Sequence, residues 1–309
     1  MVYDMISCGQ FGQQLAELVN SSYRHIARCV YKESLVQEDL QGKNAIAGFY
    51  QFDKLDLSEI KWIHAFGAGV DDYLKQPTIQ RDLILTRTLG YMDKRIGEYC
   101  LAYVLEGLKS VVSTHDNQRS HLWDRTNLNV LYNKKVLVLG TGFIGQGIAS
   151  ALRHLVEKID GINGSGTSIP LFHQTMAIEN LPQAHLEHYD IVISALPLTP
   201  TTRNFLNQAF FRLLHGAFFM NVGRGKSLVE DDLLWALENG HVRKAVLDVY
   251  QTEPLPSDSP LWDHSGVIMT PHHSGLTTFE DIRKSFEESV KAIKSGTRNQ
   301  LFVNINQGY

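Results

Sequence analysis

The chain has 309 residues, and its 29 Lys and Arg against 33 Asp and Glu give a formal net charge of −4 at pH 7. Hydrophobic residues make up 43% and charged residues 20%, so the chain can bury a core and is not expected to be disordered. Without a basic excess or an apolar run of membrane-spanning length, we expect neither a nucleic-acid nor a membrane partner, and two domains at about 150 residues each.

Three cysteines, Cys8, Cys29 and Cys100, are an odd number without a CxxC spacing. They predict neither a disulfide framework nor a metal site, and they fit a reducing, cytoplasmic location. The first five residues lack the positive start and the apolar stretch of a signal peptide, so none is expected.

The first hundred residues predict a small α/β unit. Residues 13–19 have the pattern of a helix, and residues 95–112 form a long candidate helix that would connect two domains. Candidate strands are short apolar runs at residues 3–7, 45–50, 62–66 and 83–86.

From Lys134 onward, short runs rich in Val and Ile alternate with stretches of helical period. This alternation is typical of βαβ units and predicts a doubly wound parallel sheet. The helices are expected at residues 144–155 and 231–239, the latter with acidic residues in its first turn and Gly240 after its end. The strands are expected at residues 136–139, 159–163, 191–196, 217–222, 245–249 and 267–270. Near the C-terminus, residues 279–295 carry apolar residues on one helical face, and this helix is expected to return to the first domain.

A GxGxxG motif follows the first of these strands and opens the helix after it. Gly140 permits the tight turn, Gly142 lets the backbone approach a pyrophosphate, and Gly145 allows close helix–strand packing. The helix start at Phe143 and Ile144 supplies N–H groups for the phosphates. Because the motif has its required context, we prefer a dinucleotide site to a glycine-rich turn without a ligand.

The second strand bears on the choice between NAD and NADP. An acid about 20 residues after the motif binds the ribose of NAD, and that count reaches Asp160, which lies inside the strand. Asn163 is nearer to the ribose position, and a neutral residue there tolerates a 2′-phosphate, to which Ser165 and Thr167 can donate hydrogen bonds. NADP is therefore favoured, although the absence of an Arg after the strand leaves NAD as the alternative.

Charged side chains follow several of the predicted strands, at the sheet edge where ligands bind. Each alone has an ordinary interpretation as a loop residue, but the four together at one edge favour a site: Arg224, Asp248, Glu253 and His272. Other residues just after the strands are expected to contact the cofactor: Leu196, Pro197, Val222, Ser274 and Gly275.

This set suits hydride transfer to a 2-keto acid. Arg224 can bind the substrate carboxylate with two hydrogen bonds. His272 can protonate the carbonyl oxygen near neutral pH, and Glu253 can hold that histidine charged and oriented.

The chain resembles the D-isomer-specific 2-hydroxyacid dehydrogenases over nearly its whole length. The matching motifs, in order and spacing, are residues 140–145, 196–202, 221–225, 247–250 with Glu253-Pro254, and 270–272. The resemblance implies that Arg224, Glu253 and His272 are catalytic and that Asp248 binds the nicotinamide carboxamide. It implies a dinucleotide-binding (Rossmann) domain, residues 98–278, inserted into a smaller flavodoxin-like α/β substrate domain, residues 1–97 plus 279–309.

Within this family the bacterial glyoxylate/hydroxypyruvate reductases look most similar, on residues 97–99, 253–262 and 308–309. That likeness implies NADPH and a homodimer, although many members have an Arg after the second strand that is absent here. The loop at residues 66–71 looks like the family loop whose backbone N–H groups, here those of Ala68 and Gly69, hold the substrate carboxylate. From the residues alone a plain turn is favoured there.

Alternatives to a reductase of small 2-keto acids remain open at this point. The same fold occurs in dinucleotide-sensing regulatory proteins, and a reductase of larger 2-keto acids is compatible with the same residues. A formate dehydrogenase is disfavoured because that branch has Gln where Glu253 stands, and a phosphoglycerate dehydrogenase because no regulatory domain or NAD acid is seen. His272 directly follows Pro271 as in the family, so it is preferred to His273 as the acid.

Overall fold

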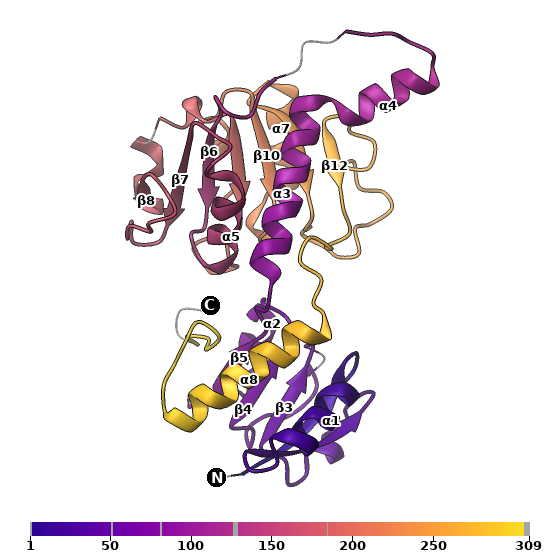
Figure 1. Ribbon diagram of the computed structural model, residues 1–309, viewed down its shortest axis with the longest axis vertical. Helices are drawn as coiled ribbons and strands as arrows, with labels where there is room; N and C mark the ends of the chain where they lie inside the picture. The colour runs from indigo at the N-terminus through magenta and orange to yellow at the C-terminus, as the bar shows by residue number, and fades with distance from the viewer. Residues whose placement is uncertain (1, 51, 81, 126–128, 184, 306–309) are drawn as a thin grey trace. The chain divides into compact units, whose positions relative to one another are not determined.

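The computed structural model describes residues 2–50, 52–80, 82–125, 129–183 and 185–305, so residues 308–309 of the resemblance lie outside it. The chain divides into two compact units (Figure 1). Unit 1 contains Met1–Tyr91 and Thr277–Tyr309, and unit 2 contains Met92–Leu276. Unit 1 therefore combines residues from the two ends of the sequence, and the chain crosses between the units twice.

Unit 1 has a five-stranded parallel sheet with the order β2-β1-β3-β4-β5, which is the flavodoxin-like order. Its strands are β1 (Tyr3–Cys8), β2 (Ala27–Lys32), β3 (Ala45–Gly48), β4 (Trp62–Ala65) and β5 (Ile84–Arg87). Its helices are α1 (Gly12–Ser22), η1 (Gln37–Leu40), α2 (Asp71–Leu74) and α8 (Phe279–Ser295). The sequence predicted β1, β3, β4 and β5 to within two residues at each end, and it predicted α8 with the same bounds.

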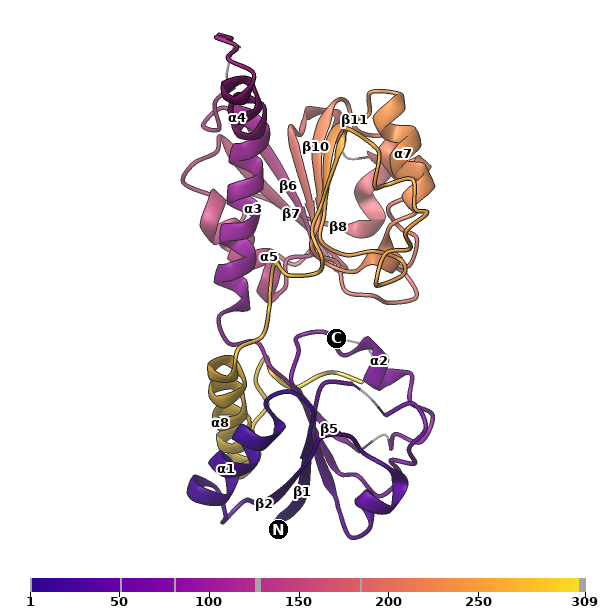
Figure 2. The ribbon, with the colours of Figure 1, turned by 90° about the vertical axis from the view of Figure 1, so that its right-hand side faces the viewer.

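Helices α1 and α8 cover one face of this sheet (Figure 2). The apolar stripe of α8, with Ile282, Phe286 and Val290, packs against Trp62 and Phe66 in a buried cluster. α8 begins with a capping box in which the Thr278 hydroxyl and the Asp281 carboxylate satisfy each other's backbone N–H groups. These contacts explain why the C-terminal helix returns to the first unit.

Strand β2 was not predicted from the sequence. It lies at the edge of the sheet, and only Ala27 and Cys29 of its six residues are buried. Because most of its side chains face solvent, the strand lacks the apolar run that revealed its neighbours.

Unit 2 has a seven-stranded parallel sheet with the order β12-β11-β10-β9-β6-β7-β8. The chain reverses its direction of growth between β6 and β9, which is the topological switch point where doubly wound sheets bind ligands. The strands are β6 (Lys135–Leu139), β7 (Lys158–Asn163), β8 (Thr175–Ala177), β9 (Ile191–Ser194), β10 (Ala217–Asn221), β11 (Val242–Leu247) and β12 (Val267–Met269). Six of these were predicted; β8 was not, because its residues Thr175–Ala177 contain neither Val nor Ile, unlike the three residues of β12.

Helices cover both faces of this sheet (Figure 2). They are α3 (Met92–Lys109), α4 (Val111–Arg119), α5 (Phe143–Leu152), η2 (Ile178–Gln183), η3 (Leu186–His188), α6 (Gln208–Phe211), η4 (Gly225–Ser227) and α7 (Glu230–Glu238). α3 packs so closely on α5 that a Cβ on Gly97 would lie only 2.8 Å from the Gly147 carbonyl oxygen.

The connecting helix differs from the prediction of one helix over residues 95–112. α3 begins earlier, at Met92, and it ends at Lys109 because Ser110 has the left-handed φ of 51°. A second helix, α4, follows, and none of its residues is buried. Ser110 gives no sequence signal for such a break, so the prediction of a continuous helix to residue 112 is wrong.

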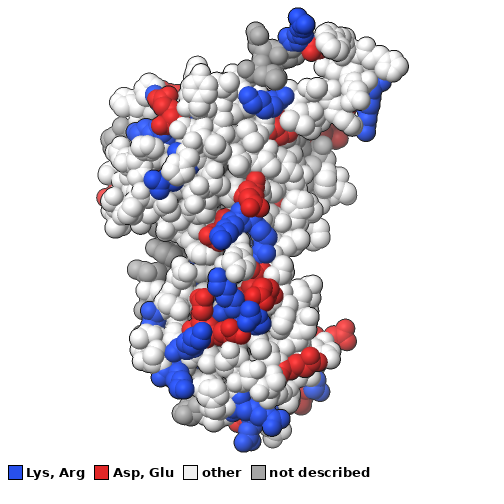
Figure 3. All heavy atoms as spheres, viewed as in Figure 1, with Lys and Arg blue, Asp and Glu red and all other residues white. Residues whose placement is uncertain are grey.

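All three cysteines are free thiols with buried side chains. Among the helices that the structure describes, none is long and apolar enough to span a membrane. Basic and acidic side chains are interspersed on the face drawn in Figure 3. On α8, for example, Arg283 pairs with Glu280 at 2.6 Å and with Glu287 at 2.7 Å.

Candidate active site

The glycine motif forms the connection between β6 and α5. Gly140 has a φ of 98°, and a Cβ there would lie 2.7 Å from the Ala195 carbonyl oxygen. A Cβ on Gly145 would overlap the carbonyl oxygen of Gly140, whereas one on Gly142 would meet nothing within 4 Å. α5 begins at Phe143 without a side-chain cap, so Phe143 and Ile144 belong to an uncapped first turn. The motif thus leaves open space at the one glycine that a pyrophosphate would approach.

Asp160 and Asn163 take the places that the strand prediction gave them. Asp160 lies inside β7, is fully buried, and accepts a hydrogen bond of 2.6 Å from the Tyr189 hydroxyl. Asn163 is the last residue of β7, and its amide donates to the Thr141 hydroxyl at 3.0 Å. The side-chain oxygen Oδ1 of Asn163 accepts from the N–H groups of Ser165 and Gly166 at 3.2 and 2.6 Å. The Asn163 side chain therefore braces the loop after β7.

Strands β9 and β10 end in loops that lie close together. Leu196 and Pro197 follow β9, and Val222 follows β10, where its N–H donates to the Ser194 carbonyl oxygen at 2.9 Å. A Cβ on Gly223 would lie 2.6 Å from the Leu196 carbonyl oxygen, which explains the glycine at this point. The structure therefore brings these predicted residues to the edge that carries the glycine motif.

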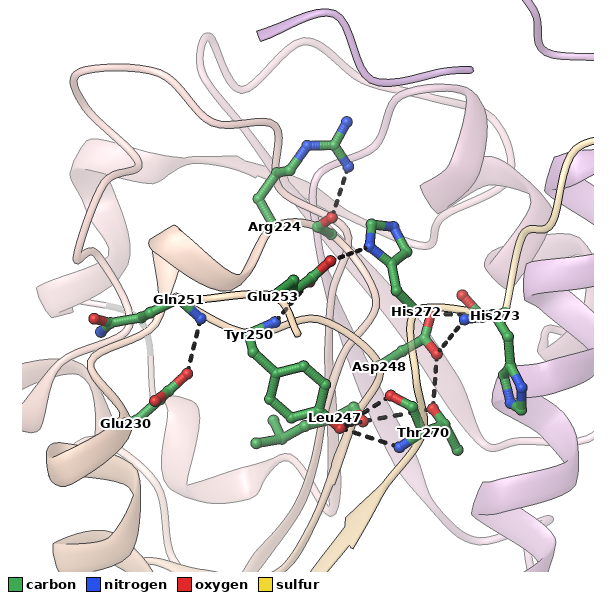
Figure 4. Close-up of polar contacts among 12 residues, drawn as sticks. Arg224, Glu230, Leu247, Asp248, Tyr250, Gln251, Glu253, Thr270, His272 and His273 are labelled. Atoms are coloured by element: carbon green, nitrogen blue, oxygen red, sulfur yellow. Dashed lines mark hydrogen bonds and ion pairs between the residues drawn. The ribbon is translucent and has the colours of Figure 1, made fainter. Parts of the chain in front are cut away.

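Arg224 follows Gly223 and is half-buried. The Asn221 amide donates to the Arg224 carbonyl oxygen at 3.2 Å, and the Ser227 hydroxyl donates to the same oxygen at 2.6 Å. The guanidinium donates to the Gly223 carbonyl oxygen at 2.8 Å. In the view of Figure 4 it lies above the Glu253–His272 pair.

Glu253 and His272 form a hydrogen-bonded ion pair of 2.7 Å between Oε2 and Nδ1 (Figure 4). The other oxygen of Glu253 accepts from the Tyr250 N–H at 3.0 Å. Burial opposes ionisation of Glu253, but the hydrogen bonds from His272 and Tyr250 outweigh it, so its pKa is lowered. The hydrogen bond to Glu253 raises the pKa of His272, against burial and the positive charge of Arg224. Both shifts favour a protonated histidine whose Nε2 is available as an acid.

Asp248 is fully buried directly after β11. Its Oδ1 accepts hydrogen bonds from the Thr270 hydroxyl at 2.7 Å and from the His273 N–H at 2.9 Å. Its Oδ2 accepts from the Ser274 N–H at 3.0 Å. Asp248 therefore holds the backbone that follows His272. Gly275 packs on α3, since a Cβ there would lie 2.8 Å from Ile96.

Sequence reasoning missed two tyrosines beside this group. The Tyr250 hydroxyl lies 2.9 Å from the carbonyl oxygens of Leu247 and Thr270 and accepts from the Thr270 N–H at 3.1 Å. The Tyr99 hydroxyl lies 2.6 Å from the Thr270 hydroxyl. Both tyrosines lie in segments that carry the family resemblance, residues 97–99 and 247–250, but the sequence assigned no role to their hydroxyls, whose partners are distant in the chain.

In unit 1, the loop after β4 contains Ala68 and Gly69, and both are partly exposed. Among the described residues, no hydrogen-bond partner is found for the N–H of either. The loop is held from behind, because the Thr88 N–H donates to the carbonyl oxygens of Ala65 and Gly67 at 2.9 and 3.3 Å. This geometry leaves two adjacent N–H groups able to bind an anion.

Only one group of possible metal ligands is found within the described part of the chain: His185, Glu187 and His188. All three are exposed, and they lie at η3, before β9 rather than after it. They are therefore separate from the residues at the carboxyl ends of the strands.

Comparison with known proteins agrees with this geometry. Residues 101–274 match the family model described as D-isomer specific 2-hydroxyacid dehydrogenase, NAD binding domain. A Streptomyces coelicolor relative described as an uncharacterized protein in the mprR 3′ region is 34% identical over 81% of this chain and 90% of its own length. A glyoxylate/hydroxypyruvate reductase A of Serratia proteamaculans is 32% identical over 81% of this chain and 82% of its own.

A solved structure gives the same result for the fold. The NADPH-dependent glyoxylate/hydroxypyruvate reductase of Sinorhizobium meliloti, in complex with NADP and sulfate, has a TM-score of 0.82 and 26% identity. The match covers 99% of this chain and 100% of that chain. The family match, the inserted doubly wound sheet and the Glu253–His272 pair agree: the chain belongs to the D-isomer specific 2-hydroxyacid dehydrogenases and is an NAD(P)-dependent oxidoreductase.

Proposed function

We propose that the chain reduces a small 2-keto acid of the glyoxylate or hydroxypyruvate kind to the 2-hydroxy acid, in the D configuration where the product is chiral. The observation that carries this proposal is the 2.7 Å pair of His272 and Glu253 beside Arg224. The relatives named as glyoxylate/hydroxypyruvate reductases support the choice of substrate.

Each of these side chains has one task in the proposed reaction. Arg224 binds the substrate carboxylate and polarises the carbonyl. The N–H groups of Ala68 and Gly69 in unit 1 are assigned, on the family resemblance, to the binding of a carboxylate. A nicotinamide cofactor bound in unit 2 would supply the hydride. His272 donates its Nε2 proton to the oxygen as the C=O double bond becomes a single bond, and Glu253 stabilises the charge on the histidine.

We propose that unit 2 is the cofactor domain and unit 1 the substrate domain, with NADPH preferred to NADH. The neutral Asn163 would not repel a 2′-phosphate, and the hydroxyls of Ser165 and Thr167 lie 2.6 Å apart on the exposed loop after β7. Because the Asn163 side chain is already used within the loop, these two hydroxyls are the donors we assign to the phosphate. The glycine motif, Leu196, Pro197, Val222, Asp248, Ser274 and Gly275 line the remainder of the proposed cofactor site.

We propose a homodimer that forms through the connection between α3 and β6. Within this connection, α4 extends away from the sheet of unit 2 (Figure 1). The described residues of the connection include large apolar side chains that are strongly exposed: Val111, Val112, Leu122, Trp123 and Tyr132, of which Trp123 is 88% exposed. Such a set of exposed apolar residues is typical of an interaction surface. A cytoplasmic location remains our proposal on the basis of the free thiols.

The decisive experiment is a substrate panel of glyoxylate, hydroxypyruvate, pyruvate and branched 2-keto acids, each assayed with NADPH and with NADH. We expect the highest kcat/KM for glyoxylate and hydroxypyruvate with NADPH. Equal rates across the panel, or cofactor binding without turnover, would contradict the reductase assignment. A clear NADH preference would overturn the cofactor choice, and a monomer in light-scattering measurements would overturn the dimer.

A further inference from the structure

His272 has a backbone conformation that its own side chain does not favour. Its φ is 49°, in the left-handed region that residues with a Cβ rarely adopt. A residue keeps such a conformation only when surrounding contacts determine it. The contacts around His272 therefore have to explain how its ring comes to face Glu253.

We propose that Tyr99 and Thr270 are positioning residues that fix the direction of His272 through Asp248. This proposal rests on the proposed function, in which His272 is the acid. Neither residue touches the reacting atoms in this scheme, and each acts through a chain of hydrogen bonds from α3 to the loop after β12.

The direction of these hydrogen bonds follows from the number of protons available. The Thr270 hydroxyl has one proton, and at 2.7 Å from the Asp248 carboxylate it donates that proton to Oδ1. The Tyr99 hydroxyl, 2.6 Å from the same Thr270 oxygen, must then be the donor to it. The chain runs from Tyr99 to Thr270 and from Thr270 to Asp248.

Asp248 in turn holds the backbone that follows His272. Its two oxygens accept from the N–H groups of His273 and Ser274 at 2.9 and 3.0 Å. On the other side of His272, its own N–H donates to the Thr270 carbonyl oxygen at 3.0 Å. The backbone of His272 is thus held on both sides by contacts that involve Thr270 or Asp248.

Burial makes this arrangement effective. Asp248 is fully buried and Thr270 is only 6% exposed, so water cannot replace a lost hydroxyl without entering the interior. Buried carboxylates are sensitive to the loss of a donor, because the alternative is an unsatisfied charge. Removing the Thr270 hydroxyl is therefore expected to displace the loop that carries His272.

The test compares Thr270→Val with Thr270→Ser and Tyr99→Phe. We expect Thr270→Val to lower kcat about tenfold and Tyr99→Phe about threefold, because small misplacements of a reacting group are costly. Thr270→Ser retains the hydroxyl and should recover most of the wild-type kcat. Because Asp248 is also assigned to the cofactor, the KM for the cofactor is measured in all three variants, and a rise in that KM without a fall in kcat would contradict the positioning role.

Tyr189→Phe is the matched control. Tyr189 donates at 2.6 Å to Asp160, another fully buried carboxylate in the same unit, so the variant removes the same type of contact away from His272. Its kcat should equal that of the wild type even if its melting temperature falls as much as that of Thr270→Val. A kcat loss in Tyr189→Phe as large as that in Thr270→Val would overturn the proposal.

A second measurement separates this proposal from the proposed function. The imidazole of His272 can be titrated by NMR in the ligand-free protein, with the signal assigned by its loss in His272→Gln. The groups that face this ring are Glu253, Arg224 and Asp248. If the loop shifts, the hydrogen bond from His272 to Glu253 weakens, and Thr270→Val should lower the pKa of His272.

The outcomes are distinct. A wild-type protein that reduces no 2-keto acid refutes the proposed function, while a lowered pKa of His272 in Thr270→Val still supports the positioning. A wild-type protein that is active, with a Thr270→Val variant unchanged in kcat and in the pKa of His272, refutes the positioning alone. Failure of Thr270→Ser to restore kcat also refutes it, because packing would then explain the loss.

Discussion

Two histidines, one in each unit, have opposite electrostatic surroundings. His64 lies on β4 and is fully buried among the rings of Trp62, Phe66 and Phe286, and burial lowers its pKa to about 3. His272 lies after β12, half-exposed, and its hydrogen bond to Glu253 raises its pKa. Burial without a charged partner keeps one histidine neutral, whereas a carboxylate partner favours the charged form of the other.

The hydrogen bonds of His64 agree with a neutral ring. The Trp62 indole donates to the Thr86 hydroxyl at 2.9 Å, and that hydroxyl lies 2.9 Å from Nδ1 of His64. The Thr88 hydroxyl lies 3.5 Å from Nε2, so each ring nitrogen faces a hydroxyl, and a neutral imidazole is satisfied by these two groups in either tautomer. His64 is thus part of the support of the sheet, and of these two histidines it is His272 that has the surroundings of an acid.

The largest expected effect comes from removing the acid. His272→Ala should lower kcat by about 10²–10⁴-fold, which is the usual contribution of general acid catalysis. His273→Ala is the matched control, because the sequence places it beside the acid, and it should retain most activity. Steady-state kinetics with glyoxylate and NADPH measure both variants. The reverse pattern would assign the acid to His273.

Removing the carboxylate partner should move the pH profile. Reduction needs protonated His272. The kcat for reduction is therefore expected to be highest below the raised pKa of His272 and to fall as the pH rises through it. Glu253→Gln removes the charge that raises this pKa, so the fall should move to lower pH and the rate near pH 7 should drop about tenfold or more. The measurement is kcat against pH, and an unchanged profile would contradict the role of Glu253.

The comparison also predicts a difference in stability. The unfolded chain protonates His64 near pH 6.5, whereas the folded protein does so only near its pKa of about 3, so the unfolded state binds more protons between these values. The free energy of unfolding should therefore fall by about 2–3 kcal/mol between about pH 6.5 and 4.5 from this residue.

Chemical denaturation at several pH values in wild type and in His64→Phe tests this expectation. His64→Phe should be less stable at neutral pH, because Thr86 loses a partner, and it should lose less stability on acidification. His25→Phe, a change of an exposed histidine, is the control and should follow the wild-type curve. Parallel pH curves for His64→Phe and wild type would contradict burial of a neutral ring.

The smallest expected effect concerns the cofactor phosphate. Ser165→Ala removes one exposed hydroxyl of the loop after β7, and we expect the KM for NADPH to rise about threefold, the effect of losing one hydrogen bond of roughly 0.6 kcal/mol. The KM for NADH should not change, since NADH has no 2′-phosphate. Equal changes with both cofactors would place Ser165 away from the phosphate.

Much of the fold was readable because it depends on local patterns. The buried strands of the seven-stranded sheet are continuous apolar runs. The glycine motif is recognisable because the positive φ of Gly140 and the close packing at Gly145 require glycine locally. The same reading located Asp160 inside its strand. By contrast, β2 and the break at Ser110 carry no local signal. The exposed edge strand β2 lacks an apolar run, and a single left-handed residue at Ser110 does not change the helical pattern of the sequence around it.

The sequence by itself determined the two sheets, the return of the C-terminal helix and the set of Arg224, Asp248, Glu253 and His272. Parallel strands bring their carboxyl ends to one edge, so order along the chain was enough to bring these residues together. Only the tertiary structure decided how they are held. The chain from Tyr99 through Thr270 to Asp248 joins residues 171 and 22 positions apart, and no local pattern encodes such contacts. They arise because packing α3 against the sheet excludes water and leaves these hydroxyls to satisfy a buried carboxylate.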